Sequence, residues 1–277
     1  MTNVKHNAKA QFRALHEARN TFVIPNPWDV GTARILASLG FKALATTSAG
    51  MCFGLGINEG TATREQFLEH CRMLVNATDL PVSADLEKGF GDSPESVAET
   101  IRDAAATGLA GGSIEDYSGD SDNPIFDFDL AVERVAAAVE ACRSLSDDFV
   151  FTARAENLCY GRNDLDDTIR RLQAFETVGA DVLYAPGLRD LEAIRTVCAS
   201  VTKPVNVVMG LSKTTFSVDE LRDAGVARIS VGAALARAAF GEFVRAAREI
   251  ADAQTFTYTE RAISFAEMEG LLTPDDS

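Results

Sequence analysis

Short runs of β-branched and other apolar residues alternate with longer amphipathic stretches along almost the whole chain. The short runs are typical of buried strands, and the stretches have the apolar spacing of helices that pack on one face. Several stretches end at a glycine, which permits the left-handed turn that closes a helix. Strands are predicted at 22–26, 43–47, 82–85, 112–115, 150–154, 182–184, 205–207 and 228–231, and helices at 30–39, 63–77, 94–107, 129–145, 165–178, 188–198, 218–224 and 233–251.

Eight β-α units without a break in composition predict an α/β fold, a (β/α)₈ barrel of the TIM type. An N-terminal helix at 8–18 precedes the first unit, and an extra C-terminal helix at 259–271 follows the last. We interpret residues 1–277 as a single barrel domain, with 252–277 as a helical tail suited to exchange between subunits. A dinucleotide-binding sheet is disfavoured, because Gly54, Gly56 and Gly60 neither directly follow a predicted strand nor open a helix.

The composition of the chain limits the kinds of molecule that we expect it to bind. The chain of 277 residues is 46% hydrophobic, which allows a large core, and carries a net charge of -15. That charge repels nucleic acid and anionic membranes, so we expect neither as a partner. The five cysteines form no C-x-x-C pair, which favours a reduced, cytoplasmic protein. The N-terminus lacks the apolar stretch of a signal peptide, and no apolar run is long enough to span a membrane.

Carboxylates follow two neighbouring predicted strands. Asp85 and Glu87 end the third strand and Glu115 ends the fourth, so a barrel brings them to one end of the sheet. Crowded carboxylates repel one another unless a cation offsets their charge, which favours Mg²⁺, with Mn²⁺ as the alternative. Asp85 would coordinate the metal, while Glu87, Glu115 and Glu59 would hold metal-bound waters. The alternative interpretation is a pair of solvated acidic loops.

Three other strand ends supply groups for a small 2-oxo acid. Arg154 would bind a substrate carboxylate through paired hydrogen bonds, although a structural ion pair with Glu115 or Glu156 is the alternative. Backbone N–H groups in a turn at 48–50 would bind an oxyanion. The metal would polarise the 2-oxo group and stabilise an enolate. The expected substrate-binding set is Ser48, Ala49, Gly50, Asp85, Arg154 and Asn206, and the expected catalytic set is Arg154, Glu115 and Ser48.

Proton donors are harder to assign. Tyr117 and Tyr184 follow strands and are the candidate acids, although tyrosines at such positions are more often packing residues. His6 lies in the N-terminal lead-in, and His16 and His70 lie on predicted helices, so a histidine general base is not expected.

Five motifs in register carry a family resemblance. They are the runs 47–50, 85–91, 113–116, 153–156 and 204–206, and the segment 24–29 adds to them. Together they resemble the isocitrate lyase/phosphoenolpyruvate mutase superfamily over about residues 20–240. The resemblance implies a Mg²⁺-dependent barrel acting on a 2-oxo acid or its enolate, usually a homotetramer with an exchanged C-terminal helix. It also implies the metal roles of Asp85, Glu87, Glu115 and Glu59, and substrate contacts from Ser48, Gly50, Arg154 and Asn206.

The loop after the fourth strand departs from that family. Isocitrate and methylisocitrate lyases carry Lys-Lys/Arg-Cys-Gly-His there, and phosphonate enzymes carry Lys and Asn. Here residues 117–124 read YSGDSDNP, with no cysteine, lysine or histidine. We therefore expect C–C cleavage or decarboxylation of a 2-oxo or 2-hydroxy mono- or dicarboxylic acid such as oxaloacetate. The alternatives are C–P bond chemistry and a non-catalytic barrel that binds a 2-oxo acid. The loop itself is either a lid or an exposed turn.

Overall fold

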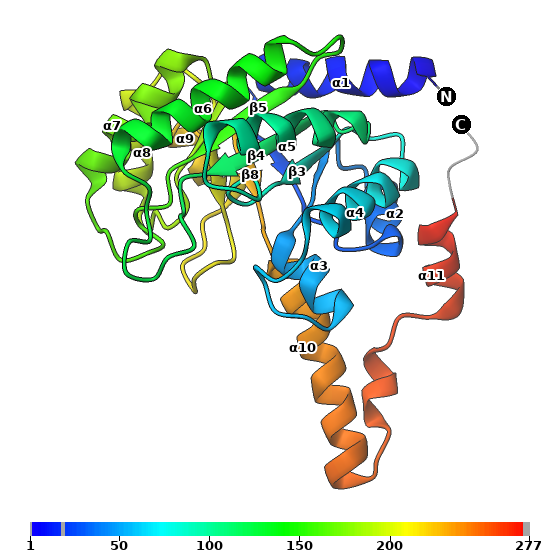
Figure 1. The fold of residues 1–277 in the computed structure, drawn as a ribbon. Helices are drawn as coiled ribbons and strands as arrows, with labels where there is room; N and C mark the ends of the chain where they lie inside the picture. The colour runs from blue at the N-terminus through cyan, green and yellow to red at the C-terminus, as the bar shows by residue number, and fades with distance from the viewer. Residues whose placement is uncertain (1, 18–19, 274–277) are drawn as a thin grey trace.

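Eight parallel strands form the centre of the molecule, as predicted. The computed structural model describes residues 2–17 and 20–273, and Figure 1 shows its fold. The strands are β1 (Phe22–Ile24), β2 (Leu44–Ala45), β3 (Val82–Asp85), β4 (Gly111–Glu115), β5 (Val150–Arg154), β6 (Val182–Tyr184), β7 (Val205–Val208) and β8 (Arg228–Ser230). All ladders are parallel, in the order β1-β8-β7-β6-β5-β4-β3-β2. The predicted (β/α)₈ architecture is therefore confirmed.

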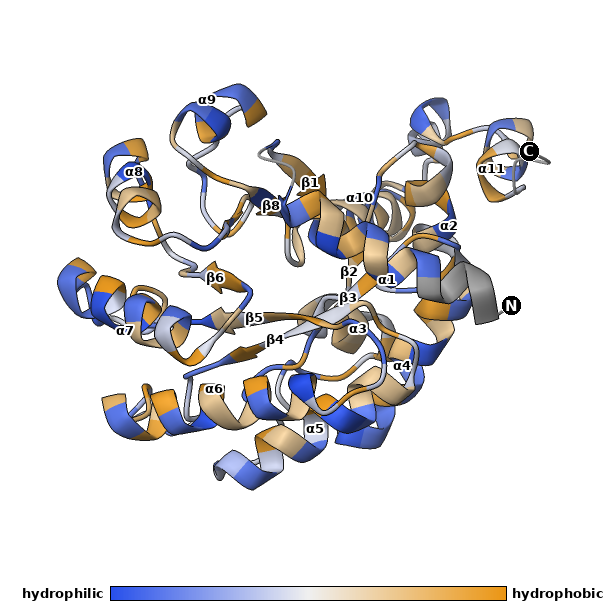
Figure 2. Ribbon diagram, turned by 90° about the horizontal axis from the view of Figure 1, so that it is seen from above, coloured by the Kyte–Doolittle hydropathy of each residue, from blue (hydrophilic) through white to orange (hydrophobic). Residues whose placement is uncertain are grey.

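Helices surround the strands, and Figure 2 shows α4 to α9 around the barrel. They are α1 (Thr2–Glu17), α2 (Val30–Ser38), α3 (Ser48–Leu55), α4 (Arg64–Ala77), α5 (Pro94–Ala106), α6 (Phe128–Arg143), α7 (Leu165–Val178), α8 (Leu191–Ser200), α9 (Val218–Asp223), α10 (Ala234–Arg248) and α11 (Phe265–Leu272), with a π-helical turn η1 (Glu249–Ala253) and a 3₁₀ turn η2 (Thr257–Arg261). No helix in the described part of the chain is long and apolar enough to cross a membrane.

Two local predictions were wrong. Residues 48–50 do not form a turn but open α3, because the Thr47 side chain caps this helix by accepting a hydrogen bond from the Gly50 N–H at 3.1 Å. The tail is not one helix over 259–271. It consists of η2 followed by α11, and Ser264 caps α11 through the Glu267 N–H.

The barrel is nearly closed between β1 and β2. The two strands form no ladder, and one backbone hydrogen bond joins them, from the Ala45 N–H to the Pro25 carbonyl at 3.0 Å. The buried Asn26 side chain completes the join. Its Nδ2 donates to the Thr46 carbonyl at 2.8 Å, and its Oδ1 accepts the N–H groups of Val231 and Gly232 at 2.9 Å each. Asn26 thus links β2 to the end of β8.

Helix α1 lies at the end of the barrel opposite to α3 and α10 (Figure 1). His16 is one of the residues that attach it, together with Lys9 and Arg13, which pair with Asp147, Asp148 and Asp181. The His16 Nδ1 donates to the Phe12 carbonyl at 2.7 Å, which leaves Nε2 to accept from Arg228 Nη1 at 3.3 Å. The imidazole also packs edge-on against Phe12 and Phe22. This arrangement suits the neutral ring, and burial together with the Arg228 charge lowers the pKa of His16 to about 3.

We expect acid to weaken the attachment of α1. The unfolded chain binds a proton at His16 below a pH of about 6.5, whereas the folded chain resists until about pH 3, so stability falls as the pH drops through this window. His16 should account for about 2 kcal/mol of the loss between pH 7 and pH 5. Urea unfolding of wild type and His16→Gln at both pH values measures this contribution. An equal loss in the two proteins would contradict it.

Candidate active site

A cavity of about 340 Å³ opens at the carboxyl ends of the strands. Of the predicted site residues, Ser48, Ala49, Glu59, Asp85, Arg154 and Asn206 line it. Gly50, Glu87 and Glu115 lie outside the lining, although Glu115 contacts the lining residue Arg154. Most of the predicted site residues therefore lie together at one cavity. The volume of this cavity suits a small ligand.

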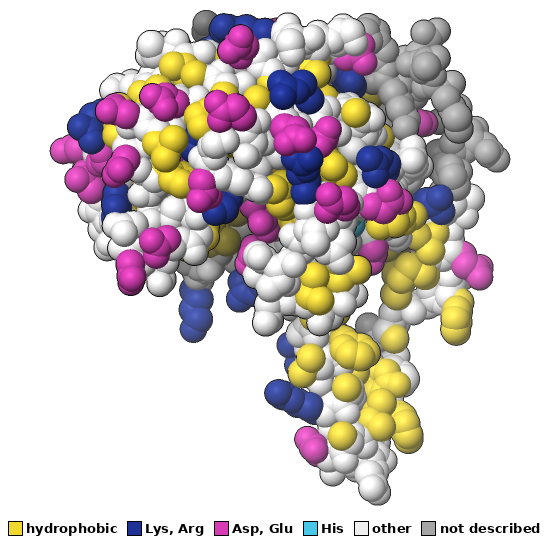
Figure 3. Space-filling view, in the orientation of Figure 1, with side chains coloured by type: hydrophobic (Ala, Val, Ile, Leu, Met, Phe, Trp, Pro, Cys, Tyr) yellow, Lys and Arg dark blue, Asp and Glu magenta, His cyan; other side chains and the backbone are white. Residues whose placement is uncertain are grey.

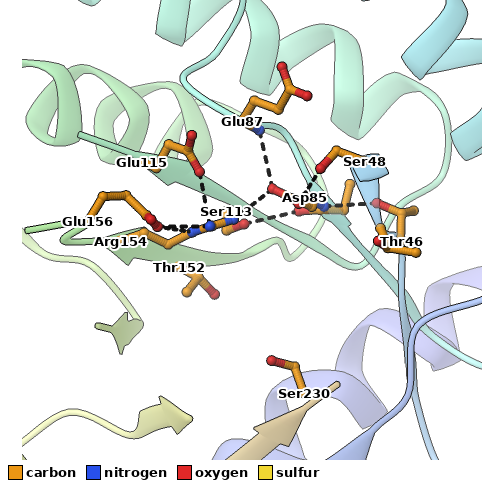
Figure 4. Close-up of polar contacts among 12 residues, drawn as sticks. Thr46, Ser48, Asp85, Glu87, Ser113, Glu115, Thr152, Arg154, Glu156 and Ser230 are labelled. Carbon is orange, nitrogen blue, oxygen red and sulfur yellow. Dashed lines mark hydrogen bonds and ion pairs between the residues drawn. The ribbon is translucent and has the colours of Figure 1, made fainter. Parts of the chain in front are cut away.

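Arg154 is the centre of this site. Its guanidinium lies 2.8 Å from Asp85 Oδ1, 3.0 Å from Glu115 Oε2 and 2.8 Å from Glu156 Oε1 (Figure 4). Glu115 and Arg154 are register partners on β4 and β5, which explains why these two side chains meet. Among the side chains of residues 7–17 and 20–273, no other Lys, Arg or His reaches ion-pair distance of these three acids. The structural ion pair considered above is therefore present, and Asp85 shares it.

Charge is unbalanced around Arg154. Burial alone would lower the pKa of Arg154, but Glu156, Glu115 and Asp85 raise it well above its ordinary value. Burial raises the pKa of Glu115 and Glu156 although Arg154 opposes the shift. Burial, Asp85 and Glu59 raise the pKa of Glu87 to about 7. One guanidinium is not enough to offset this many carboxylates, so the site favours a second cation or bound protons.

Ser48 joins two of the acids at the first turn of α3. Its Oγ lies 3.0 Å from Asp85 Oδ2 and 3.2 Å from Glu59 Oε1, yet a hydroxyl has one proton to donate. The hydroxyl can therefore donate to only one of these carboxylates at a time, and burial together with Asp85 raises the pKa of Glu59 although the Ser48 hydrogen bond opposes the shift. The first-turn N–H groups of Ser48 and Ala49 have no acceptor within the helix and suit an anion.

The side-chain amide of Asn206 on β7 is already hydrogen-bonded to two residues of β8. Its Nδ2 donates to Ser230 Oγ at 3.0 Å, and its Oδ1 accepts from Arg228 Nε at 2.8 Å. Arg228 also donates to Thr152 Oγ1 at 3.0 Å and lines the cavity. Asn206 thus orients Arg228, a contact that does not support its predicted role in binding substrate directly.

The residues fit a magnesium ion in donor type, but they do not form a finished ligand cluster. No group of three His, Cys, Asp or Glu side chains in the described ranges is arranged to hold a metal. Glu87 Oε1, however, is buried without a hydrogen-bond partner, which is costly unless another group binds it. Since Mg²⁺ binds few protein oxygens directly and keeps several waters, the acids around Asp85 match its needs.

The loop after β4 is held at its base. Tyr117 and Ile125 form an antiparallel bridge, and the Ser118 N–H donates to the Pro124 carbonyl at 2.8 Å. Tyr117 also stacks on Tyr160, a residue of the cavity lining, with ring centroids 3.9 Å apart. Residues 117–125 therefore form an ordered rim at the cavity, whose tip, 119–123, is largely exposed.

Asp116 turns away from the cavity and joins a buried network. Asp116 Oδ2 lies 3.0 Å from Arg171 Nη1, and both side chains are 3% exposed. Asp116 Oδ1 accepts the Glu156 N–H at 2.7 Å, and Arg171 also donates to the Phe126 carbonyl at 3.0 Å. The network ties both ends of the rim loop, residues 117–125, to the backbone of Glu156. The Glu156 side chain in turn contacts Arg154.

Several contributing residues were not assigned a role from the sequence. Glu156 was considered from the sequence only as a structural ion-pair partner of Arg154, and its place two positions after Arg154 puts it on the same side. Arg228 occupies an inward position in an apolar strand, which is another readable signal. Cys159 and Tyr160 line the cavity from the loop after β5, and no pattern in the sequence reveals that position.

Comparison with known proteins identifies the family. The model of the family described as phosphoenolpyruvate phosphomutase matches residues 12–251. The chain belongs to this family.

Relatives within the phosphoenolpyruvate mutase/isocitrate lyase superfamily carry different activities. A crystal structure from Burkholderia cenocepacia J2315, provisionally described as a lyase/mutase, is 53% identical, with a TM-score of 0.96 and coverage of 99% of this chain and 98% of that one. The 2-methylisocitrate lyase of Escherichia coli K12 is 30% identical, covering 80% of this chain and 77% of that protein. The oxaloacetate decarboxylase of Chromohalobacter salexigens is 27% identical, covering 80% and 76%. The superfamily resemblance is confirmed, and the substrate is open.

Removing the Asp85 carboxylate should abolish magnesium binding. We expect Mg²⁺ to raise the melting temperature of the wild type, and Asp85→Ala to lose that rise because its carboxylate is central to the acid cluster. Thermal melts with and without Mg²⁺ measure the effect. Asp79→Ala, an exposed change just before the same strand, is the control and should retain the shift. A shift that survives in Asp85→Ala would show that the metal binds elsewhere.

Proposed function

We propose that this protein is a Mg²⁺-dependent lyase, with Mn²⁺ as a substitute metal, acting on a small 2-oxo or 2-hydroxy acid through an enolate. Oxaloacetate is the first substrate to test. The observation that carries the proposal is the excess of carboxylates over cations in direct contact: among the described side chains, Arg154 is the one cation in ion-pair contact with Asp85, Glu115 and Glu156. A divalent cation would offset that excess and leave positive charge available for a substrate anion.

The metal would be held by Asp85, with Glu59, Glu87 and Glu115 binding its waters. The orphaned Glu87 Oε1 supports this assignment. When bound, Mg²⁺ supplies positive charge that polarises a 2-oxo group and stabilises an enolate.

The chain's own residues would bind the substrate and manage the proton. We assign the substrate carboxylate to Arg154 and to the first turn of α3, where Ser48 and Ala49 line the cavity. In decarboxylation of oxaloacetate the C3–C4 bond breaks and CO₂ leaves. The electron pair of the broken bond remains on the pyruvate part as an enolate, which then takes a proton at C3. Burial raises the pKa of Cys159, Tyr160 and Tyr184, so these cavity residues retain a proton to donate.

C–P bond chemistry is the second candidate, because the matching family model is that of phosphoenolpyruvate phosphomutase. The rim loop weighs against it, since residues 117–125 contain no lysine. Lys88 approaches that loop, but its Nζ is occupied by the Ser118 carbonyl and by Asp92, each at 2.6 Å.

Purified protein with Mg²⁺ should release pyruvate from oxaloacetate faster than Mg²⁺ alone. The reason is that the site would hold the electron sink next to the breaking bond. Coupled detection of pyruvate measures the rate, and both EDTA and Asp85→Ala should reduce it to the background.

Equal rates with and without the protein would rule out the decarboxylase. Formation of phosphoenolpyruvate or phosphate from phosphonopyruvate would favour C–P chemistry instead. Binding of 2-oxo acids without turnover of either compound would favour a non-catalytic barrel.

We also propose that the chain assembles as a homotetramer, with the tail from residue 252 contributing to the contact between subunits. Helix α10 and the turns after it project away from the barrel, and Figure 3 shows apolar side chains gathered along this arm. Phe243 is 68% exposed, Phe256 62% and Phe265 90%. Exposed phenylalanines on α10, on the segment after it and at the start of α11 suit burial against a second copy of the chain.

Light scattering after size exclusion should therefore report four chains. Replacing Phe256 and Phe265 by Asp should shift the mass toward smaller species, because charged groups would oppose burial of the arm. Exchanging the exposed Met73 of α4 for Asp is the matched control. A wild type that elutes as a monomer would contradict the assembly.

A further inference from the structure

The loop that follows β3 has an unusual backbone. Within residues 86–92, Glu87 has a φ of 48°, Gly89 of 85° and Phe90 of 56°. In the described part of the chain only one other non-glycine residue, Gln254, has a positive φ. L-residues avoid this region unless the surroundings impose it, and such strain is often found at functional sites. Here the strained loop carries Glu87, next to the Asp85 carboxylate.

Arg134 of α6 supplies three of the contacts that hold this backbone. Its Nη1 donates to the carbonyls of Gly91 at 2.9 Å and Asp92 at 2.5 Å, and its Nη2 donates to the carbonyl of Lys88. Two other donors hold neighbouring carbonyls of the loop: Thr100 Oγ1 donates to the Gly89 carbonyl at 2.8 Å, and the Glu115 N–H donates to the Glu87 carbonyl at 3.0 Å. Nearly every carbonyl of the loop therefore has a fixed donor.

The Arg134 side chain is itself held firmly and at a cost. The residue is 1% exposed, and its guanidinium lies 4.3 Å above the centre of the Phe126 ring. Its hydrogen-bond partners in the described structure are all backbone carbonyls, so its charge has no carboxylate in direct contact. Burying a guanidinium in this way is expensive, so its hydrogen bonds to the three carbonyls of the loop must offset that cost.

We propose that Arg134 is a positioning residue that holds the loop 86–92 in its left-handed conformation and so presents Glu87 to the metal site. This inference rests on the proposed Mg²⁺ site. Arg134 contacts neither substrate nor metal in this scheme. It acts through the backbone on either side of Phe90, much as outer-shell groups orient metal ligands elsewhere.

The test uses two measurements on the full-length protein. Isothermal titration with Mg²⁺ alone gives the dissociation constant, and amide hydrogen exchange reports opening of residues 86–92. Arg134→Met removes the donors, and Arg134→Gln retains two neutral N–H donors. We expect both to exchange faster in this loop and to bind Mg²⁺ about 10-fold more weakly or worse, with Arg134→Lys recovering part of the loss.

Arg143→Met is the matched control, because Arg143 is exposed at the end of the same helix. It should match wild type in both measurements. Folded Arg134 variants with unchanged loop exchange and a Mg²⁺ dissociation constant within twofold of wild type would overturn the inference. So would failure of all three Arg134 variants to fold, since Arg134 would then support the whole barrel.

A wild type that binds no Mg²⁺ would refute the proposed function separately. The exchange data would then decide the Arg134 inference alone: faster exchange confined to residues 86–92 would uphold its effect on the loop, and unchanged exchange would overturn it.

Discussion

One buried guanidinium facing three carboxylates is the constraint on which the rest of the site depends. Arg154 must lie at the end of β5 for its fork to reach Glu115 on β4, Asp85 on β3 and Glu156 on its own strand's loop. Taking these charges out of water costs several kcal/mol each, and close contact recovers that cost only when the geometry is good. The parallel register of β3, β4 and β5 provides that geometry. Ser48 at the first turn of α3 and Arg134 of α6 then help to keep the acids in place.

Much of the fold was predictable because it depends on local pattern. Eight apolar runs separated by amphipathic stretches identify the barrel, and the barrel alone implies that Asp85, Glu115 and Arg154 converge. The start of α3 was not predictable in the same way, since a two-residue strand and a capping threonine at Thr47 decide it. The engagement of Asn206 by Arg228 depends on a side chain from a neighbouring strand, which no one-dimensional pattern encodes.

The loop at the rim of the cavity differs from the strand ends in how it matches the superfamily. The motifs that carry the resemblance lie at the strand ends, whereas residues 117–124 lack the cysteine, lysine and histidine expected from it and are held by their own contacts. Those supports come from outside the loop: Tyr160 stacks on Tyr117, and Arg171 anchors Phe126 and Asp116. The conformation of this loop thus depends on residues of the next β-α unit as well as on its own.

The closure of the barrel at Asn26 has a consequence of its own. At this join one amide side chain accepts from β8 and donates to β2, where other strand pairs use a ladder of backbone bonds. Only a group with both an acceptor and a donor at this length can do so; aspartate lacks the donor and leucine lacks both. The spacing between the ends of β8 and β2, and with it the position of the first turn of α3 two residues past Thr46, therefore depends on the reach of a side chain as well as on the backbone bond from Ala45 to Pro25.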